Sequence, residues 1–279
     1  MKIKNILNKP AFYIIVGWLL ILWTAATDTG LTVPKYKVVS EKIKKSVRIV
    51  LLTDFHSSGY GKDQCVLTKA IDSQKPDIIL MAGDIAEDVR SHKNTKELLS
   101  QIADKYPCFY TVGNHEEWSG ECEAIKEMFR SHGVSVLEGD NEILDINGQK
   151  IRVSGADNSL PQDQLNACYE AAGDDIFTVF VSHRPDLVRE YSGHGFDLVV
   201  CGHAHGGQVR IPHILNGLYA PNQGIFPKYA GGRYTLDDGS TEMIVSRGLC
   251  KNSLPRVFNP PEVVVIDVCG DGSEAVTDR

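Results

Sequence analysis

The stretch VVCGHAHGGQ, Val199 to Gln208, places two histidines directly after a run that we expect to be a buried strand. The run DLVVC, Asp197 to Cys201, is apolar in the way that parallel strands covered on both faces are. Side chains two positions apart in a strand point to the same face, so His203 and His205 would share one face. Packing explains neither imidazole. The pair therefore indicates a polar site whose other members come from elsewhere in the chain.

Polar side chains also follow four other apolar runs that we expect to be strands. These runs cover residues 47–53, 77–82, 108–112 and 176–182. The side chains that follow them are Asp54 with His56, Asp84, Asn114 with His115, and His183. In open α/β sheets, ligands bind at the carboxyl ends of the strands. The fold is therefore expected to bring these groups to one edge, although they lie far apart in the chain.

Predicted helices alternate with these strands, which indicates an α/β fold with helices on both faces of a sheet. Asp63 is expected to cap the first helix, and Asn94 with Glu97 the second. Further helices are expected over 121–132 and 161–172. A hairpin is expected to close around Asn147-Gly148. Its strands at 142–146 and 150–154, with later strands near 241–246 and 262–268, indicate a second, mixed sheet.

The N-terminal segment, residues 1–30, differs from the rest of the chain. Lys2, Lys4 and Lys9 precede Ala11–Thr27, which are seventeen residues without a charge. About 17–25 apolar residues can span a bilayer as a helix, whereas the apolar core of a signal peptide is usually shorter. We therefore expect a membrane anchor with the rest of the chain outside the cytoplasm, because lysines favour the cytoplasmic side. The alternative is a cleaved signal and a secreted protein.

After this segment we expect a charged, mobile linker over 31–46 and then one domain over 47–270. Composition limits what the domain binds. The net charge of -7 argues against a nucleic-acid partner, because nucleic acids are bound by basic surfaces. The seven cysteines are odd in number and contain no C-x-x-C pair, which excludes a disulfide framework and a zinc-thiolate knuckle.

Aspartate, asparagine and histidine together are the ligands of divalent transition metals such as Mn, Fe and Zn. Seven such residues are too many for one tetrahedral ion and fit two metal ions that share a carboxylate. Two-metal sites of this kind clamp the attacking and leaving oxygens in a displacement at phosphorus. The candidate ligands are Asp54, His56, Asp84, Asn114, His183, His203 and His205.

These blocks resemble the calcineurin-like metallophosphoesterases, whose pattern is D-x-H, G-D, G-N-H-[DE], H and G-H-x-H. All five blocks are present here, in the expected order, between residues 47 and 268. Three further stretches resemble a membrane-associated bacterial branch of that family. They are GGQVRIP (Gly206–Pro212), APNQG (Ala220–Gly224) and NPPE (Asn259–Glu262).

The resemblance implies a four-layer αββα sandwich with two mixed sheets. It also implies that Asp54, His56, Asp84 and His205 hold one metal ion, and that Asp84, Asn114, His183 and His203 hold the other. His115 matches the family's non-ligand histidine, which protonates the leaving oxygen or stabilises charge there, and Glu116 or a nearby acid is a candidate to orient it. Candidate phosphate contacts are Arg184, Arg210, Arg247 and Arg256; surface ion pairs are the alternative for all but Arg210. His213 is a candidate to line a substrate pocket.

The function implied is hydrolysis of a phosphodiester or pyrophosphate bond, by attack of a hydroxide formed between two divalent metal ions. A membrane anchor favours a lipid-linked or envelope phosphate ester, such as a UDP-2,3-diacylglucosamine-type substrate. A soluble cyclic nucleotide is the other substrate class considered. A different class of function is a catalytically silent, membrane-attached metal-binding scaffold. The presence of Asp84, Asn114 and His115 argues against it, since inactive relatives tend to lose such residues.

Overall fold

The apolar runs form the central strands of two mixed sheets in the computed structural model, which describes residues 10–251 and 256–271. The first sheet has the order β1 (Lys35–Val39), β14 (Val264–Cys269), β2 (Val47–Leu52), β3 (Ile78–Ala82), β4 (Cys108–Thr111) and β5 (Ser135–Val136). The second has the order β12 (Gly232–Thr235), β13 (Glu242–Val245), β9 (Leu198–Cys201), β8 (Phe177–Val181), β7 (Gln149–Gly155) and β6 (Asn141–Ile146). β2, β3 and β4 are parallel to one another, as are β7, β8 and β9.

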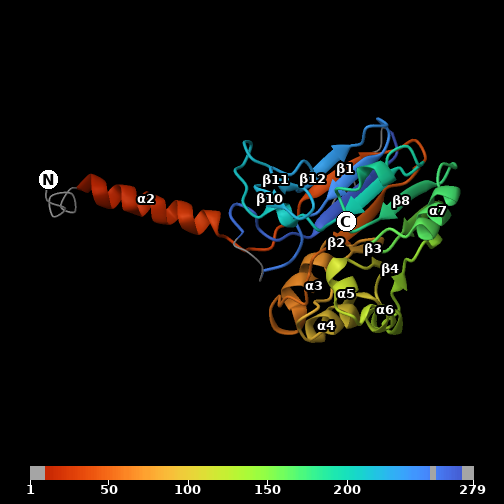
Figure 1. Cartoon of the computed structure of the whole chain (residues 1–279), viewed down its shortest axis with the longest axis horizontal. Coiled ribbons are helices and arrows are strands. Elements are labelled where there is room, and N and C mark those ends of the chain that lie inside the picture. Colours follow the sequence, from red (N-terminus) through yellow and green to blue (C-terminus); the bar gives the residue numbers. More distant parts are fainter. Residues whose placement is uncertain (1–9, 252–255, 272–279) are drawn as a thin grey trace.

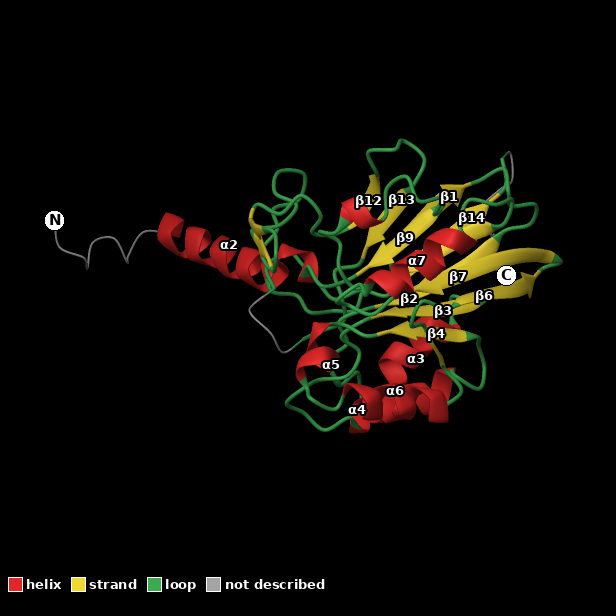
Figure 2. Cartoon of the chain, turned by 45° about the vertical axis from the view of Figure 1, so that its right-hand side comes forward, coloured by secondary structure: helices red, strands yellow, loops and turns green. Residues whose placement is uncertain are grey.

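The two sheets pack face to face, and helices cover their outer faces (Figure 2). Inward side chains such as Ile49 and Leu80 meet Val153 and Val179 from the other sheet. The outer face of the first sheet packs against α3 (Cys65–Asp72), α4 (Lys93–Ile102) and α6 (Cys122–Ser131). α7 (Gln162–Ala171) covers the second sheet. The resulting layers are helix, sheet, sheet and helix, as the resemblance implied.

The prediction of a mobile linker was wrong for Lys35–Val39. These residues form β1, an edge strand that pairs with β14 in parallel. Lys35 is exposed, whereas Val38 is buried in the core between the sheets. Lysines alternate with apolar residues here because one side of the edge strand meets solvent and the other meets the core.

The predicted helix caps were also wrong. Asp63 lies in a short 3-10 turn, η1 (Lys62–Gln64), and makes no capping hydrogen bond. α4 begins at Lys93, before Asn94, and its N-cap residue makes no side-chain capping bond. The Asn94 amide instead donates to the carbonyl of Ser57, 2.8 Å away. The predicted hairpin around Asn147-Gly148 is confirmed between β6 and β7.

The uncharged N-terminal segment forms α2 (Pro10–Ala26), which projects from the end of the domain (Figure 1). Within the described ranges, no helix reaches the length and apolar character needed to cross a membrane. α2 is nevertheless apolar on its surface. Trp18 and Trp23 are 68% and 66% exposed, and Leu19 and Leu20 are similarly uncovered.

A buried ion-pair network joins α6 to the loop that follows β7. The Lys126 ammonium lies 2.6 Å from a Glu138 oxygen and 2.9 Å from an Asp157 oxygen. The Lys126 side chain is 4% exposed, so this cation holds two carboxylates that are largely removed from water.

We predict that Lys126→Ala lowers the free energy of unfolding by ~3–5 kcal/mol, because it leaves Asp157 buried without its counter-ion. Lys105→Ala removes the exposed pair with Asp72 and should cost only ~0–1 kcal/mol. Urea unfolding followed by circular dichroism compares the two variants. Equal losses would show that burial of the Lys126 network does not stabilise the fold.

Candidate metal centre

The carboxyl ends of β2, β3, β4, β8 and β9 bring the candidate ligands together at one edge of the two sheets. Two groups of side chains converge there, and within each group the ligand atoms lie within 4.8 Å of one another. The first group is Asp54, His56, Asp84 and His205, and the second is Asp84, His183 and His203. Asp84 belongs to both groups. This arrangement has the composition that the resemblance implied.

In the first group, imidazoles from both sheets face the two aspartates. His56 Nε2 lies 3.6 Å from Asp84 Oδ2, and His205 Nε2 lies 3.7 Å from Asp54 Oδ1. The rings of His56 and His205 are stacked with centroids 5.3 Å apart. Asp54 also accepts the backbone N–H of His203 at 2.9 Å, which links the two sheets through this carboxylate.

In the second group, His183 lies at the centre. Its Nε2 is 3.2 Å from Asp84 Oδ2, 3.1 Å from Asn114 Oδ1 and 3.1 Å from His203 Nδ1. The opposite nitrogen, Nδ1, is 2.9 Å from the carbonyl of Ala82, which fixes the orientation of the ring. Asn114 therefore joins this group, and all seven candidate ligands lie at the same edge.

The donor set fits divalent cations. Both ring nitrogens of His56, which lie 3.6 Å from Asp84 Oδ2 and 3.2 Å from Glu87 Oε2, are buried and have no hydrogen-bond partner among the described residues. Buried polar atoms normally have partners, so unpaired nitrogens beside carboxylates indicate that a further ligand belongs there. Nitrogen and oxygen donors without a thiolate suit Mn, Fe and Zn alike.

Burial and ion pairing shift the pKa values within these groups. Burial opposes charge on His56, but Glu87 and Asp84 raise its pKa to about 10. Burial likewise opposes charge on His183, and Asp84 raises its pKa to about 9. The pKa of Asp84 is held well below its usual range, against burial, chiefly by His183. Cation binding therefore has to displace protons from these imidazoles.

His115 lies beside the first group and is partly open to solvent, with a side chain 29% exposed. Its ring is 4.6 Å from the ring of His56, centroid to centroid. Nδ1 lies 3.1 Å from both Glu87 Oε1 and Asp88 Oδ1. These carboxylates accept a hydrogen bond from Nδ1–H and so favour the tautomer that carries the proton there. The second ring nitrogen, Nε2, is then the atom available to a substrate. His56, Glu87 and His115 also form a third group of convergent ligand atoms.

Of the acids considered to orient His115, Glu116 does not do so, because it binds the backbone instead. Its carboxylate accepts N–H groups from Asp84, Ala86 and Gly113 at 2.8–2.9 Å. Burial and the neighbouring Asp84 charge raise the pKa of Glu116 to about 7. The orienting acids are Glu87 and Asp88. They are the nearby acids that the sequence left unidentified, because no motif singled them out.

Five of the seven candidate ligands have a left-handed backbone conformation. The φ angles of Asp54, His56, Asp84, His203 and His205 lie between 46° and 66°. Such angles cost energy in residues other than glycine and concentrate at functional sites, where surrounding contacts hold them. The strand ends are thus strained in the positions that turn these side chains toward one another.

Two glycines permit close contacts at this edge, for different reasons. Gly83 has a φ of 77°, and a Cβ there would lie 2.5 Å from the ring of His183. Gly113 has an ordinary negative φ, but its Cβ would lie 2.1 Å from Asp84 Oδ1. Position 113 therefore needs glycine because no space exists for a side chain.

Four arginines were candidate phosphate contacts. Arg184 forms an ion pair with Asp186, and Arg247 forms an ion pair with the buried Glu262. Both therefore match the ion-pair alternative to a phosphate contact. Arg256 is buried, donates to the carbonyl of Arg247 at 2.8 Å, and has an Nε without a partner among the described residues. Arg210 donates to neutral acceptors and lines a pocket with His213.

Two asparagines of the site carry roles that sequence reasoning missed. Asn222 Oδ1 is 2.7 Å from His203 Nε2 and so sets the orientation of that imidazole. Asn259 Nδ2 donates to the carbonyl of His205 at 2.7 Å. Asn222 lies in APNQG and Asn259 in NPPE, two stretches noted above for their resemblance to a family branch. The sequence therefore drew attention to both stretches but did not indicate that these asparagines orient the candidate ligands.

Comparison with known proteins gives the family of this chain. A family model described as calcineurin-like phosphoesterase matches residues 47–207. Uncharacterized metallophosphoesterase Cj0846 of Campylobacter jejuni is 30% identical over 88% of this chain and 66% of its own length. Uncharacterized metallophosphoesterase YkuE of Bacillus subtilis is 27% identical over 78% of this chain and 77% of its own. Phosphodiesterase YaeI of Escherichia coli is 27% identical over 79% and 82%.

The fold and the site thus define a metal-dependent phosphohydrolase. The chain belongs to the calcineurin-like phosphoesterase family, since the family model covers more than half of its 279 residues.

We predict that Gly83→Ala weakens Mn²⁺ binding by at least ~tenfold, because the added methyl group displaces His183 and outer contacts of this kind govern metal affinity. Gly133→Ala is the matched control. Gly133 also has a positive φ, 82°, but a Cβ there meets nothing within 4 Å. Calorimetric titration with Mn²⁺ measures both affinities. Equal weakening in the two variants would mean that backbone strain, and not the His183 contact, is responsible.

Proposed function

We propose that this protein hydrolyses a phosphodiester or pyrophosphate bond at a two-metal centre and acts on a lipid-linked or envelope phosphate ester. The observation that supports this most strongly is the pair of ligand groups that share Asp84. The partly exposed side chain of His115 lies beside them. Asp54, His56, Asp84 and His205 would hold one cation. Asp84, Asn114, His183 and His203 would hold the other.

Bound cations would supply Lewis acidity, which stabilises charge on the phosphoryl oxygens and lowers the pKa of an attacking water. The chain's own residues orient these groups. Asn222 and the carbonyl of Ala82 fix the rings of His203 and His183. Asp84 is held in turn by the N–H of His115, which donates to its Oδ1 at 2.9 Å. A preorganised site of this kind needs little rearrangement during the reaction.

His115 donates a proton to the leaving oxygen. Its Nδ1 is fixed by Glu87 and Asp88, so Nε2 is the atom that serves the substrate. As the phosphorus–oxygen bond breaks, the proton on Nε2 passes to the departing oxygen and the imidazole becomes neutral. Because His115 is partly exposed, solvent can return the proton before the next cycle.

The proposed location is a membrane, with the catalytic domain outside the cytoplasm. The support comes from α2, whose exposed tryptophans and leucines would be covered by lipid. Lys2, Lys4 and Lys9 precede it, which favours a cytoplasmic N-terminus. The 17 residues of α2 extend about 25 Å as a helix. The alternative is that this segment directs export and is then removed.

We predict that Mn²⁺-dependent hydrolysis of bis(4-nitrophenyl) phosphate falls by about 10²–10⁴-fold in His115→Ala, because the proton donor is lost. Asp84→Asn should abolish turnover and also lower the number of Mn²⁺ ions bound per chain. His132→Ala, at the end of α6, is the control and should retain wild-type turnover. Two metal ions bound without turnover of any phosphoester would support the scaffold function instead.

We predict that Leu19→Asp combined with Leu20→Asp releases the protein from the membrane fraction, because each buried aspartate costs ~2.5–3.5 kcal/mol in a bilayer. Val66→Asp places the same charge on an exposed apolar position of α3 and should leave the distribution unchanged. Carbonate extraction measures the distribution, and protease treatment of intact spheroplasts reports the side of the domain. A wild-type chain found wholly in the soluble fraction, with residues 1–30 retained, would contradict the anchor.

A further inference from the structure

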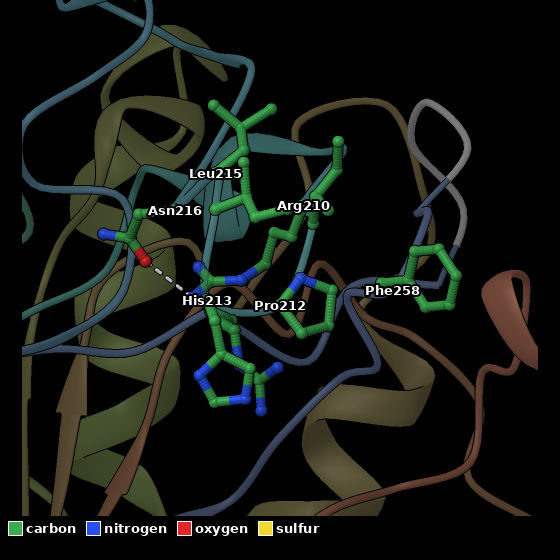
Figure 3. A pocket seen from close by; sticks show the side chains of 9 residues that line it. Arg210, Pro212, His213, Leu215, Asn216 and Phe258 are labelled. Atoms are coloured by element: carbon green, nitrogen blue, oxygen red, sulfur yellow. Dashed lines mark hydrogen bonds between the residues drawn. The ribbon is translucent and has the colours of Figure 1, made fainter.

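A pocket opens next to the loop that carries His205. It is lined by residues 210–216, Arg247 and Phe258 (Figure 3). Arg210 connects the pocket to the candidate metal centre, because its guanidinium approaches the carbonyl of Gly206, the residue after His205, at 3.4 Å. The pocket therefore lies on the same loop as a candidate metal ligand but is built from other side chains.

The polar side of the pocket carries Arg210, a cation that has no ion pair of its own among the described residues. Arg210 donates to Asn216 Oδ1 at 2.6 Å, a neutral acceptor, as Figure 3 shows. Within the described part of the chain, no carboxylate forms an ion pair with Arg210. The nearby Arg247 is already paired with Glu262. Burial and Arg247 lower the pKa of Arg210, which indicates a desolvated charge that an anion would stabilise.

The opposite side of the pocket is apolar and continues onto an exposed apolar surface. Ile211 and Ile214 are 45% and 83% exposed, and Phe258 contributes an aromatic wall. The neighbouring hairpin of β10 (Tyr219–Ala220) and β11 (Gly224–Ile225) exposes further large apolar side chains. Apolar groups of this size around one cation suit a ligand that combines a charge with a hydrocarbon chain.

The pocket also lies where α2 joins the domain. The Phe258 N–H donates to the carbonyl of Ala26, the last residue of α2, at 2.6 Å. Figures 1 and 3 show the end of α2 beside this part of the molecule. A hydrocarbon chain in the pocket would therefore leave it beside the helix whose own surface is apolar.

We infer that this pocket is a subsite for an anionic amphiphile. Arg210 binds a phosphate or carboxylate group, and the hydrocarbon part lies along Ile211, Ile214 and Phe258. The inference rests on the proposed function for its biological meaning, since it names the class of substrate presented to the metal centre. Ligand binding in the pocket can be measured separately from hydrolysis, because the residues that line the pocket are not candidate metal ligands.

The test is calorimetric binding to the full-length, Mn²⁺-loaded protein in a non-ionic detergent. The probes are dioctanoyl phosphatidate, which has both features, inorganic phosphate, which has only the charge, and dioctanoylglycerol, which has only the chains. Arg210→Gln should weaken phosphatidate binding by about tenfold or more, because a charged hydrogen-bonding partner is lost. Ile214→Ser should weaken phosphatidate but not inorganic phosphate. Arg189→Gln, an exposed arginine on η2 (Val188–Glu190), should change neither.

Equal affinities for phosphatidate in Arg210→Gln and Arg189→Gln would overturn the inference. So would equal affinities of the wild-type protein for phosphatidate and inorganic phosphate with no effect of Ile214→Ser, since the pocket would then be a simple anion site. Turnover of bis(4-nitrophenyl) phosphate by the wild-type protein is measured in parallel. Turnover without Arg210-dependent lipid binding rejects the subsite alone, whereas Arg210-dependent binding without turnover rejects the proposed hydrolysis alone.

Discussion

The carboxylate of Asp84 is the point at which both sheets and both ligand groups meet. It comes from β3 of the first sheet, is 1% exposed, and lies 3.2 Å from His183, which follows β8 of the second sheet. A buried carboxylate is costly unless cations or hydrogen-bond donors surround it. Here it is surrounded by the imidazoles of His56 and His183 and by the N–H of His115. Because the buried Asp84 carboxylate needs several cationic or hydrogen-bonding partners, residues from both sheets converge at this edge.

The backbone around Asp84 is organised for the same purpose. Glu116 collects three N–H groups from the two loops that carry Asp84 and Asn114, and it thereby clamps these loops together. Gly83 and Gly113 remove the side chains that would prevent the loops from meeting. The left-handed φ angles of five candidate ligands show that the strand ends are held away from their preferred conformations. The surrounding core of apolar strands supplies the stability that tolerates this strain.

Much of this arrangement could be predicted from the sequence, because buried parallel strands are continuous apolar runs and polar residues at their ends are conspicuous. The prediction extended to two mixed sheets and to the side chains that gather at their edge. The prediction failed where the structure depends on contacts between residues that lie far apart in the sequence. β1 alternates lysine with apolar residues and resembles a solvated segment until its pairing with β14 is known. Glu87, Asp88 and Asn222 act through contacts with His115 and His203 that only the tertiary fold creates.

The attachment of the N-terminal segment to the first sheet also limits how far the active edge can travel. Thr32 bonds to Pro261, and β1 begins three residues later, so only residues 27–31 link α2 to the first sheet, and the Ala26 carbonyl at the end of α2 also accepts the Phe258 N–H. Five residues reach at most about 18 Å when fully extended. A surface that binds α2 would therefore keep the domain close to it. With α2 in a membrane, as proposed, the enzyme would meet esters at that surface in two dimensions.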